Sequence, residues 1–405
     1  MGGMSRARPA PEPVVVQRQD QIDEFCALCR TEGRFAFDTE FVMEDRYETE
    51  VCLIQVATSS QVGLLDPLGK LDLAGIWELI CDPKIETIVH AGQEDLALCV
   101  RFAGKVPQSI FDVQIAAGLA GLDYPISLQK LVQATLHIRL HKAKTLTDWR
   151  RRPLTASQLR YAAEDVCHLP AVGDKLHAKL KSLDRLGWAK EEFQAFEQAG
   201  LYERAVEDRL QRVKGSGSLD ARQLAVVREA LHWREQLAQA RNRPARSVLK
   251  DYVLIEIARQ GLSTYAEIRD FRGLNLGDRD VHALVKVVRG ALDLPADRLP
   301  TPKPREIETP GETILITLLT AVLRNHAAGH EIAYGLLATQ KSIRELVRQF
   351  MAQGAIAGLD ADLLRGWRGR VVGKMLLDVL AGRSVLRVGQ TGARSMVDLL
   401  PAPSR

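Results

Sequence analysis

The sequence predicts an α/β domain followed by all-α units, and three observations support this fold class. Strand-like runs alternate with helix-like segments in the first half of the 405-residue chain, whereas later apolar residues recur only at helical spacing. Linker-like stretches, KGSGS at 214–218 and a segment with five prolines at 293–311, divide the helical part. The charge changes sign, because residues 1–210 carry 25 Lys and Arg against 31 Asp and Glu, and residues 211–405 carry 30 against 20.

We therefore expect three domains with different tasks. Their predicted ranges are 1–210 for the α/β domain, 218–295 for a first helical domain and 311–401 for a second.

The α/β domain is predicted to open with a three-strand meander. Its strands are FAFDTEFV (35–42), VCLIQVATS (51–59) and QVGLLD (61–66), and Ser59-Ser60 suits the second turn. A helix (73–81), a strand (85–92) and a helix (94–102) are expected next. Consecutive hairpin strands combined with such crossovers predict a mixed sheet rather than a purely parallel one.

Helical spacing dominates the rest of the chain. A long amphipathic segment covers 155–180 and begins at the N-cap residue Thr155. The first helical domain is predicted to hold four or five helices, over 219–242, 246–261, 265–271 and 280–292. The second is expected to be another small helical unit, over 313–329, 331–350, 363–367 and 371–382.

Composition excludes several classes of protein. With 46% apolar and 26% charged residues the chain is globular, and no run of 18 apolar residues could cross a membrane. Six scattered cysteines form no disulfide framework and fit a cytoplasmic protein. Cys26 and Cys29 are spaced as C-x-x-C, but the surrounding helical pattern favours a buried helix face over a zinc or redox site.

Other short signals are weak. MGGMSRARPAPEP lacks the apolar stretch of a signal peptide, and a second methionine at Met4 favours a leader or an alternative start. His326 and His330 are four residues apart without an acidic third ligand, so we interpret them as structural. Neither G-x-G-x-x-G nor G-x-x-x-x-G-K-[ST] occurs, which disfavours a dinucleotide enzyme or a P-loop ATPase.

Acidic residues next to apolar runs carry the main functional signal. Asp38 and Glu40 are two apart on a predicted strand and therefore share a face. Asp95 lies in the first turn of a helix that follows a strand, and Tyr161 and Asp165 are stacked one helical turn apart. Each segment alone has an ordinary structural explanation. Together, four oxygen donors without His or Cys are typical of a site for Mg²⁺ or Mn²⁺.

The order of these residues resembles the tyrosine-bearing branch of the DEDD exonuclease superfamily, and within it the ribonuclease D family. The resemblance extends over about residues 30–180, and its motifs are FDTEFV, LIQVA, LLDPL, VHAGQEDL, SIFDVQIAA, SLQKLV and DWRRRPLTASQLRYAAEDVCHL. The segment HWREQLAQARNRPARSVLKDYVLIEIA resembles the HRDC domain that follows the nuclease in that family, and the third domain resembles a divergent second copy.

The resemblance implies a ribonuclease H-like mixed-sheet nuclease with two divalent cations, Mg²⁺ or Mn²⁺. It implies that Asp38, Glu40, Asp95 and Asp165 hold the metals and that Tyr161 orients the attacking water. The expected activity is 3′→5′ exoribonuclease trimming of RNA with a single-stranded 3′ end, as in tRNA precursors, releasing nucleoside 5′-monophosphates. A cytoplasmic monomer without membrane contact is expected.

Basic clusters are candidates for contacts to the RNA backbone. Four cationic residues fall within ten positions of the first helical domain, and a second group precedes the Tyr161 helix. The candidates are Lys142, Lys144, Arg150, Arg151, Arg241, Arg243, Arg246 and Lys250. Arg152, beside Pro153, is either a further RNA contact or structural, and the pattern favours Trp149 as a core residue over one that stacks on a base.

Two other functions fit parts of this pattern. A DNA 3′→5′ exonuclease would use the same carboxylates, because recognition of the ribose 2′-hydroxyl depends on groups that one sequence does not reveal. A non-catalytic RNA-binding scaffold would retain the fold but not the site. The presence of all five expected residues, Asp38, Glu40, Asp95, Tyr161 and Asp165, argues against the scaffold.

Overall fold

The computed structural model describes residues 12–43, 45–140, 147–202, 210, 212–302, 308–389 and 396–403. The chain forms two compact units. The first contains residues 1–40, 53–199 and 308–405, and the second contains residues 41–52 and 200–307. The predicted leader at the N-terminus lies outside the described residues.

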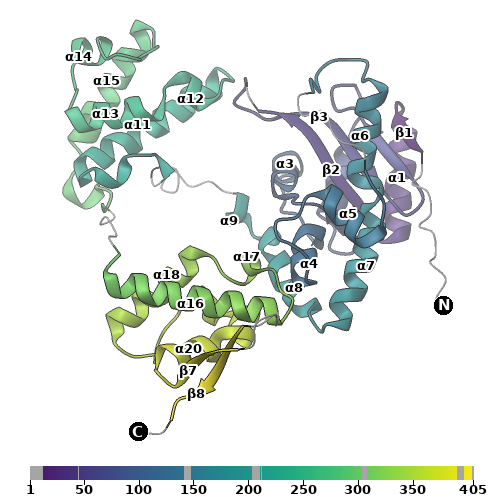
Figure 1. Ribbon diagram of the computed structural model, residues 1–405. Helices are drawn as coiled ribbons and strands as arrows, with labels where there is room; N and C mark the ends of the chain where they lie inside the picture. Colours follow the sequence, from purple (N-terminus) through teal and green to yellow (C-terminus); the bar gives the residue numbers. More distant parts are fainter. Residues whose placement is uncertain are drawn as a thin grey trace, which may run out of the picture. The chain divides into compact units, whose positions relative to one another are not determined.

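A six-stranded sheet forms the centre of the α/β region, with the strand order β1-β4-β3-β2-β5-β6 (Figure 1). Its strands are β1 (Pro13–Val16), β2 (Arg34–Val42), β3 (Glu50–Ala57), β4 (Val62–Leu65), β5 (Glu86–Val89) and β6 (Ile110–Asp112). β3 and β4 pair antiparallel, whereas β1 with β4, β2 with β5 and β5 with β6 pair parallel. The predicted mixed sheet is therefore confirmed, and the three meander strands are neighbours in chain order.

Strand β1 was not expected from the sequence. Three of its four residues are exposed, so the segment shows no alternation of buried and solvated positions. It pairs with β4 at one end of the strand order, where Pro13 can lack a backbone donor. The strand therefore forms through pairing with the completed sheet rather than through a local pattern.

Helices cover both faces of the sheet. They are α1 (Gln19–Glu32), α2 (Ala74–Ile80), α3 (Gln93–Ala103), α4 (Val113–Leu119), α5 (Leu128–Leu136), α6 (Ala156–Cys167), α7 (Leu169–Ser182), α8 (Leu186–Phe193) and α9 (Ala199–Tyr202), with a 3₁₀ turn at Gln194–Glu197. Phe37 contacts Trp77 of α2 edge-on at 5.7 Å, and Trp77 stacks on Phe102 of α3 at 5.0 Å. These contacts place α2 and α3 on the Phe37 face of β2.

The opposite face of β2 is covered by α7. Ala36 is in register with Ile88 of β5, and Ile88 lies against Gly173 of α7. Because side chains alternate along a strand, Asp38 and Glu40 share the Ala36 face, whereas Thr39 shares the Phe37 face. This alternation determines which acidic residue faces which layer.

The predicted amphipathic segment at 155–180 is two helices rather than one. Thr155 caps α6 as expected, with its side chain accepting from the backbone N–H of Gln158. The segment breaks at His168, between α6 and α7. Pro170 has no N–H to donate and is compatible only with the first turn of a new helix.

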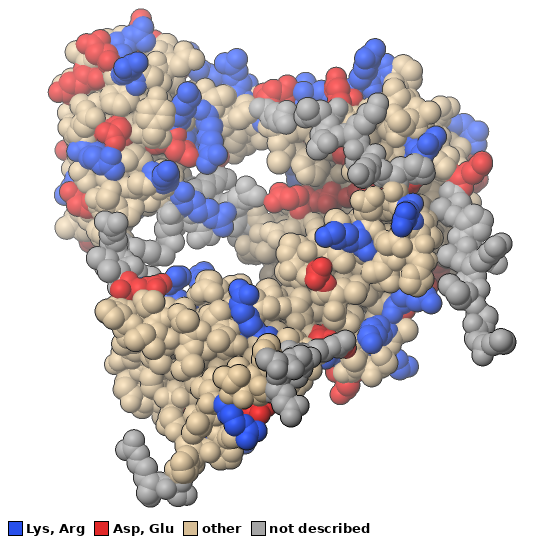
Figure 2. All heavy atoms as spheres, in the orientation of Figure 1, with Lys and Arg blue, Asp and Glu red and all other residues tan. Residues whose placement is uncertain are grey.

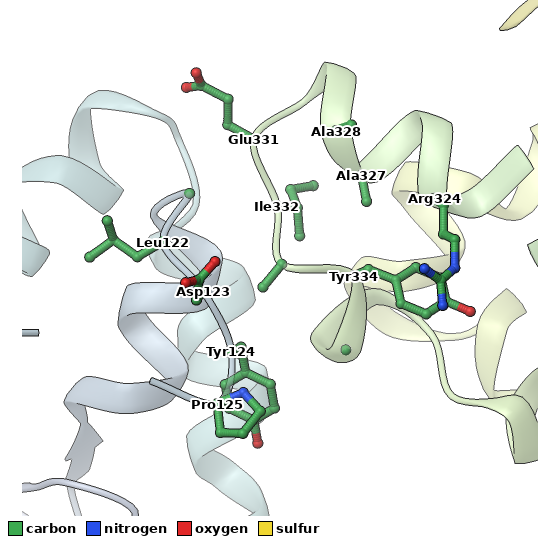
Figure 3. A pocket seen from close by; sticks show the side chains of 13 residues that line it. Leu122, Asp123, Tyr124, Pro125, Arg324, Ala327, Ala328, Glu331, Ile332 and Tyr334 are labelled. Carbon is green, nitrogen blue, oxygen red and sulfur yellow. The ribbon is translucent and has the colours of Figure 1, made fainter. Parts of the chain in front are cut away.

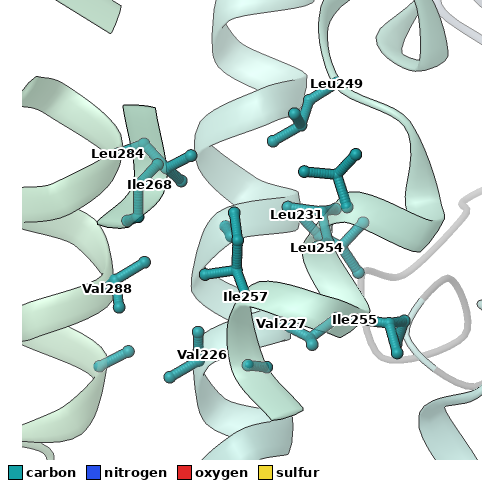
Figure 4. Packing of buried hydrophobic residues seen from close by; sticks show 14 of the residues in the cluster. Val226, Val227, Leu231, Leu249, Leu254, Ile255, Ile257, Ile268, Leu284 and Val288 are labelled. Carbon is teal, nitrogen blue, oxygen red and sulfur yellow. The ribbon is translucent and has the colours of Figure 1, made fainter. Parts of the chain in front are cut away.

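The second unit is helical. It contains α11 (Ala221–Ala240), α12 (Ala245–Val248), α13 (Asp251–Gln260), α14 (Tyr265–Arg269) and α15 (Asp278–Leu292), with 3₁₀ turns at Ser216–Ser218 and Ala296–Arg298. The long helix α11 packs on α13 and α15 around Val227, Ile257 and Leu284, which are almost fully buried (Figure 4). Tyr47, from the short segment 41–52, packs against the same core.

The C-terminal part of the first unit combines helices with a strand pair. It contains α16 (Pro310–Gly329), α17 (Tyr334–Leu337), α18 (Gln340–Gln353), a 3₁₀ turn at Asp362–Leu364, α19 (Gly366–Arg368), a π-helical turn at Gly369–Gly373, α20 (Lys374–Leu380), β7 (Ser384–Val388) and β8 (Val397–Pro401). The sequence pattern does not predict the antiparallel pair β7–β8. Asn325 of α16 holds β8 by bonding the backbone of Met396 and Val397, a tertiary contact without a sequence signal.

This C-terminal part is fastened to helices of the α/β region. Trp367 stacks on Trp188 of α8 at 5.1 Å, and its indole N–H donates to Glu192 at 2.6 Å. Glu192 also pairs with Arg368 at 2.6 Å. Arg185, buried at the start of α8, donates to the carbonyl oxygens of three residues, Leu119, His330 and Glu331. Charged groups and stacked rings thus fix the attachment.

No helix in the described part of the chain is long and apolar enough to cross a membrane.

Candidate active site

Strand β2 supplies the first two carboxylates. Asp38 and Glu40 lie toward the end of β2, on the face covered by α7. Neighbouring residues of the strand, among them Phe35 and Phe37, are almost completely buried in the core. The strand therefore holds two acidic side chains where a packed sheet would otherwise continue.

A tight turn after β5 positions the third carboxylate. Ala91 adopts a left-handed backbone with φ of 56°, and Gly92 follows at the N-cap of α3. A Cβ on Gly92 would lie 2.6 Å from the Cβ of Val89, so the turn requires glycine. Asp95 is thereby placed, buried, in the first turn of α3.

Asp112 holds this turn from β6. Its carboxylate accepts from the N–H of Gly92 at 3.3 Å and, as the N-cap of α4, from the N–H groups of Gln114 and Ile115 at 2.8 and 3.3 Å. Only 2% of Asp112 is exposed. Asp112 is not among the predicted site residues, although an acid between a strand and a helix is an N-cap signal.

Helix α6 supplies the last two residues. Tyr161 and Asp165 lie one turn apart, and the neighbouring phenol acts to lower the pKa of the Asp165 carboxyl, against the larger effect of burial. The buried ring of Trp149 lies at 6.1 Å from that of Tyr161, which confirms Trp149 as a packing residue. A phenol oxygen has lone pairs that can accept a hydrogen bond from another molecule.

The four carboxylates interact electrostatically. Burial is the main cause of each raised pKa, and it raises the pKa of Glu40 to about 8, of Asp165 to about 7 and of Asp95 to about 6. The pKa of the partly buried Asp38 is raised well above its usual value by burial and then by repulsion from Asp95, Asp165 and Glu40. The leading causes include no Lys or Arg of the described chain. The cluster therefore lacks a protein counter-charge among the groups that dominate its titration.

This donor set fits hard divalent cations. Carboxylate oxygens select Mg²⁺ or Mn²⁺ over softer metals, and a cation would relieve the buried negative charge. Among the described residues, no group of three or more His, Cys, Asp or Glu side chains has an arrangement that could hold a metal ion as it stands. The fit thus rests on charge and donor chemistry.

The predicted RNA contacts separate into three groups. Lys142 and Lys144 lie outside the described residues. Arg241 pairs with Asp280 at 2.8 Å and Arg246 with Asp251 at 3.1 Å. The remaining candidates are the exposed Arg151, Arg243 and Lys250 and the partly buried Arg150. Figure 2 shows basic and acidic side chains interspersed over the second unit, in agreement with these ion pairs.

Arg152 is a structural residue. Its guanidinium forms a fork with the Asp66 carboxylate at 2.5 and 2.7 Å and also donates to the carbonyl oxygen of Trp149. These bonds fix the segment before α6 to the end of β4. Of the two interpretations of Arg152 offered by the sequence, the geometry supports the structural one.

Other candidate groups lie apart from the carboxylates. His326 and His330 stack at 3.9 Å within α16 and its C-cap. Cys26 and Cys29 are free thiols on the buried face of α1. A cavity of about 940 Å³ lies between the segment 121–125 and the end of α16, with Arg324 over the ring of Tyr334 (Figure 3). None of the five predicted catalytic residues lines it.

Comparisons with known proteins agree on the family of this fold. Residues 13–181 match a 3′–5′ exonuclease family, and residues 223–278 match the HRDC domain. The chain is 31% identical to ribonuclease D of Granulibacter bethesdensis over 393 residues, covering 96% of this chain and 97% of that protein. It is 33% identical to ribonuclease D of Pseudomonas paraeruginosa over 378 residues, covering 92% and 98%.

Solved structures extend the similarity to three dimensions. The crystal structure of Escherichia coli RNase D, described as an exoribonuclease involved in structured RNA processing, matches with a TM-score of 0.79 and 27% identity. The match covers 92% of this chain and 99% of that chain. It therefore includes the C-terminal helices as well as the sheet that carries the carboxylates.

Proposed function

Because the chain belongs to the ribonuclease D family and is a 3′→5′ exoribonuclease, we propose that Asp38, Glu40, Asp95, Tyr161 and Asp165 form its catalytic site. The observation that carries this proposal is the carboxylate cluster, in which Asp95 is buried and the other three acids are partly buried. Three elements bring four acidic side chains into mutual repulsion, without a Lys or Arg of the described chain among the leading influences on them. Such an arrangement is stable in its charged form only when cations bind to it.

Asp38, Glu40, Asp95 and Asp165 would hold two divalent cations, Mg²⁺ or Mn²⁺. When bound, such cations supply Lewis acidity and neutralise charge at the scissile phosphate. Asp38, which is repelled by the other three acids, is the residue best suited to contact both ions. Glu40 and Asp165 would serve the side of the attacking water, and Asp95 the side of the leaving 3′-oxygen.

Tyr161 would orient the attacking water. With its hydroxyl hydrogen directed toward the neighbouring Asp165, its oxygen would accept a hydrogen bond from a water molecule. Burial and the nearby acids raise the pKa of Tyr161, which keeps the phenol protonated at neutral pH. A water held in this way directs a lone pair toward the phosphorus, and hydrolysis releases a nucleoside 5′-monophosphate.

The proposed substrate is RNA with a single-stranded 3′ end, and tRNA precursors are the proposed natural class. The family relationship and the HRDC match at 223–278 support a nucleic-acid substrate. We assign backbone contacts first to Arg243, Lys250 and Arg151, because these three residues are exposed whereas Arg241 and Arg246 are engaged with acids; Arg150, beside Arg151, is a further candidate. A divergent second HRDC-like domain at 311–401, a monomeric state and a cytoplasmic location complete the proposal.

The test compares matched, 3′-labelled single-stranded RNA and DNA. Each is incubated with Mg²⁺ and then with EDTA, with the Asp165→Asn variant alongside. We expect metal-dependent release of label from RNA by the wild type and not by the variant. A preference for DNA would instead favour the DNA exonuclease. Loss of label from neither substrate would favour the non-catalytic scaffold and would contradict the proposed site.

A further inference from the structure

We propose that Thr39 is a positioning residue that fixes the Asp95 carboxylate relative to Asp38, and so joins the two layers of the metal site. The proposal rests on the function proposed above, because it concerns how the same carboxylates are brought together. It adds a residue that lies between two of the acids in sequence but faces away from them in the fold.

Because side chains alternate along β2, the proposed metal ligands come from two different layers of the fold. Asp38 and Glu40 face the layer of α7, whereas α3, which carries Asp95, packs on the other face of the strand. The Asp95 carboxylate on α3 therefore approaches Asp38 and Glu40 from the opposite layer. Thr39 projects from β2 toward the α3 layer, at the position between the two strand acids.

Thr39 connects both sides by a hydrogen bond. Its hydroxyl donates to Oδ1 of Asp95, and both groups are buried, with Thr39 only 7% exposed and Asp95 8%. Thr39 directly follows Asp38 on β2, so this hydrogen bond links the position of the Asp95 carboxylate on α3 to the strand that carries Asp38.

Thr39 is suited to this role by its shape as well as its hydroxyl. Threonine is β-branched, which restricts χ1 and favours a strand, so the hydroxyl direction is set by packing. Groups that hydrogen-bond a metal ligand orient it, and their loss typically lowers metal affinity about 10–100-fold. We therefore expect the Thr39 hydroxyl to affect metal binding without contacting the metal.

The experiment measures Mn²⁺ binding to the full chain by titration calorimetry, without RNA. Thr39→Val keeps the branched shape but removes the hydroxyl, and Thr39→Ser keeps the hydroxyl. We expect Thr39→Val to weaken Mn²⁺ binding about 10–100-fold and Thr39→Ser to remain within about threefold of wild type. Thermal unfolding in EDTA checks that each variant folds, and Thr39→Ala replaces Thr39→Val if the latter does not.

A double-variant cycle separates positioning from general packing. If Thr39 acts through Asp95, Thr39→Val adds no further loss of Mn²⁺ affinity in an Asp95→Asn background. The role of Thr39 would be overturned by any of three outcomes. Thr39→Val could bind Mn²⁺ as tightly as wild type, Thr39→Ser could lose as much Mn²⁺ affinity as Thr39→Val, or the losses of affinity in the cycle could be additive.

A different result would concern the site itself. If the wild type binds Mn²⁺ no more tightly than Asp38→Asn does, the proposed metal site is wrong and the role of Thr39 falls with it. If the wild type binds Mn²⁺ through Asp38 but the Thr39 variants bind Mn²⁺ as tightly as wild type, the metal site stands and only the positioning role of Thr39 is wrong.

Discussion

The acids around β2 illustrate a conflict between folding and catalysis at the scale of single residues. Partial burial disfavours each charge, and the charges of Asp38, Glu40 and Asp165 also repel one another. A protein that only needed stability would replace these residues with apolar ones. Their presence beside the core is explained by the cations that they are proposed to bind.

Replacing Asp38 by Asn should therefore separate activity from stability. We expect turnover to fall by at least about 10³-fold, because an amide supplies no charge to the metals. The thermal midpoint measured in EDTA should rise, because one of the repelling carboxylates is gone. The exposed acid Glu24 of α1 provides the control, and Glu24→Gln should change stability by no more than about 0.5 kcal/mol. Mg²⁺-dependent digestion by Asp38→Asn would contradict the assignment.

The raised pKa values predict how stability depends on pH when metal is removed. Glu40, with its pKa raised to about 8, and Asp165, with its pKa raised to about 7, bind more protons in the folded state than in the unfolded state. Stability is then fully present below the ordinary carboxyl range and is lost as pH rises toward about 8. We expect the thermal midpoint in EDTA to fall between about pH 5 and pH 8, and added Mn²⁺ to reduce that fall.

A flat or rising midpoint in EDTA would show that the pKa values of these carboxylates are not raised in the folded protein. Asp38→Asn serves as the control here, because it should show a shallower fall over the same pH range.

At the scale of elements, α6 carries two of the five proposed catalytic residues and depends on its cap. The Thr155 hydroxyl accepts from the N–H of Gln158 at 3.3 Å, and the Gln158 side chain accepts from the N–H of Thr155 at 2.9 Å. Thr155→Ala should lower the free energy of unfolding by about 1 kcal/mol, as chemical denaturation would show, and should reduce turnover through Tyr161 and Asp165. Thr155→Ser, which preserves the cap, should match wild type, and equal stability of the two variants would argue against the capping role.

Most elements of the α/β region could be predicted because their signal is local. β3 and β4 are continuous apolar runs, and the C-x-x-C helix shows a clear buried face. β1 and the pair β7–β8 could not be predicted, because few of their residues are buried. Three of the four residues of β1 are exposed and the strand pairs with the distant β4, whereas β7 and β8 contain no fully buried residue. The break at His168 could have been inferred from Pro170, because proline fits an α-helix only in its first turn.

The candidate site shows the same division. The acids Asp38 and Glu40 were found from strand alternation, and Tyr161 with Asp165 from helical spacing. Thr39 and Asp112 were not found, because their hydrogen bonds join elements that are distant in the sequence. Periodicity reveals which residues share a face of one element, whereas contacts between layers require the fold.

At the scale of the whole molecule, Glu192 joins the C-terminal part to the α/β region. Its carboxylate accepts from the Trp367 indole and pairs with Arg368. Glu192→Ala should lower the free energy of unfolding of the first unit by about 1–3 kcal/mol, because two partly buried donors lose their acceptor. Chemical denaturation with Lys190→Ala, an exposed change on the same helix, as the control would test this. Equal midpoints for the two variants would show that the attachment does not depend on Glu192.

The discontinuity of the first unit also has a consequence during synthesis. Glu192 and Arg368 are 176 residues apart, so α8 leaves the ribosome long before its partner helix exists. At roughly 5–20 residues per second, the interval is on the order of ten to thirty seconds. The second unit can fold within that time. The surface around Trp188 stays exposed to solvent until the last quarter of the chain, which carries Trp367, has been synthesised. The nascent protein is therefore exposed to misassembly at this surface until residues 308–405, the last of the three segments of the first unit, have been synthesised.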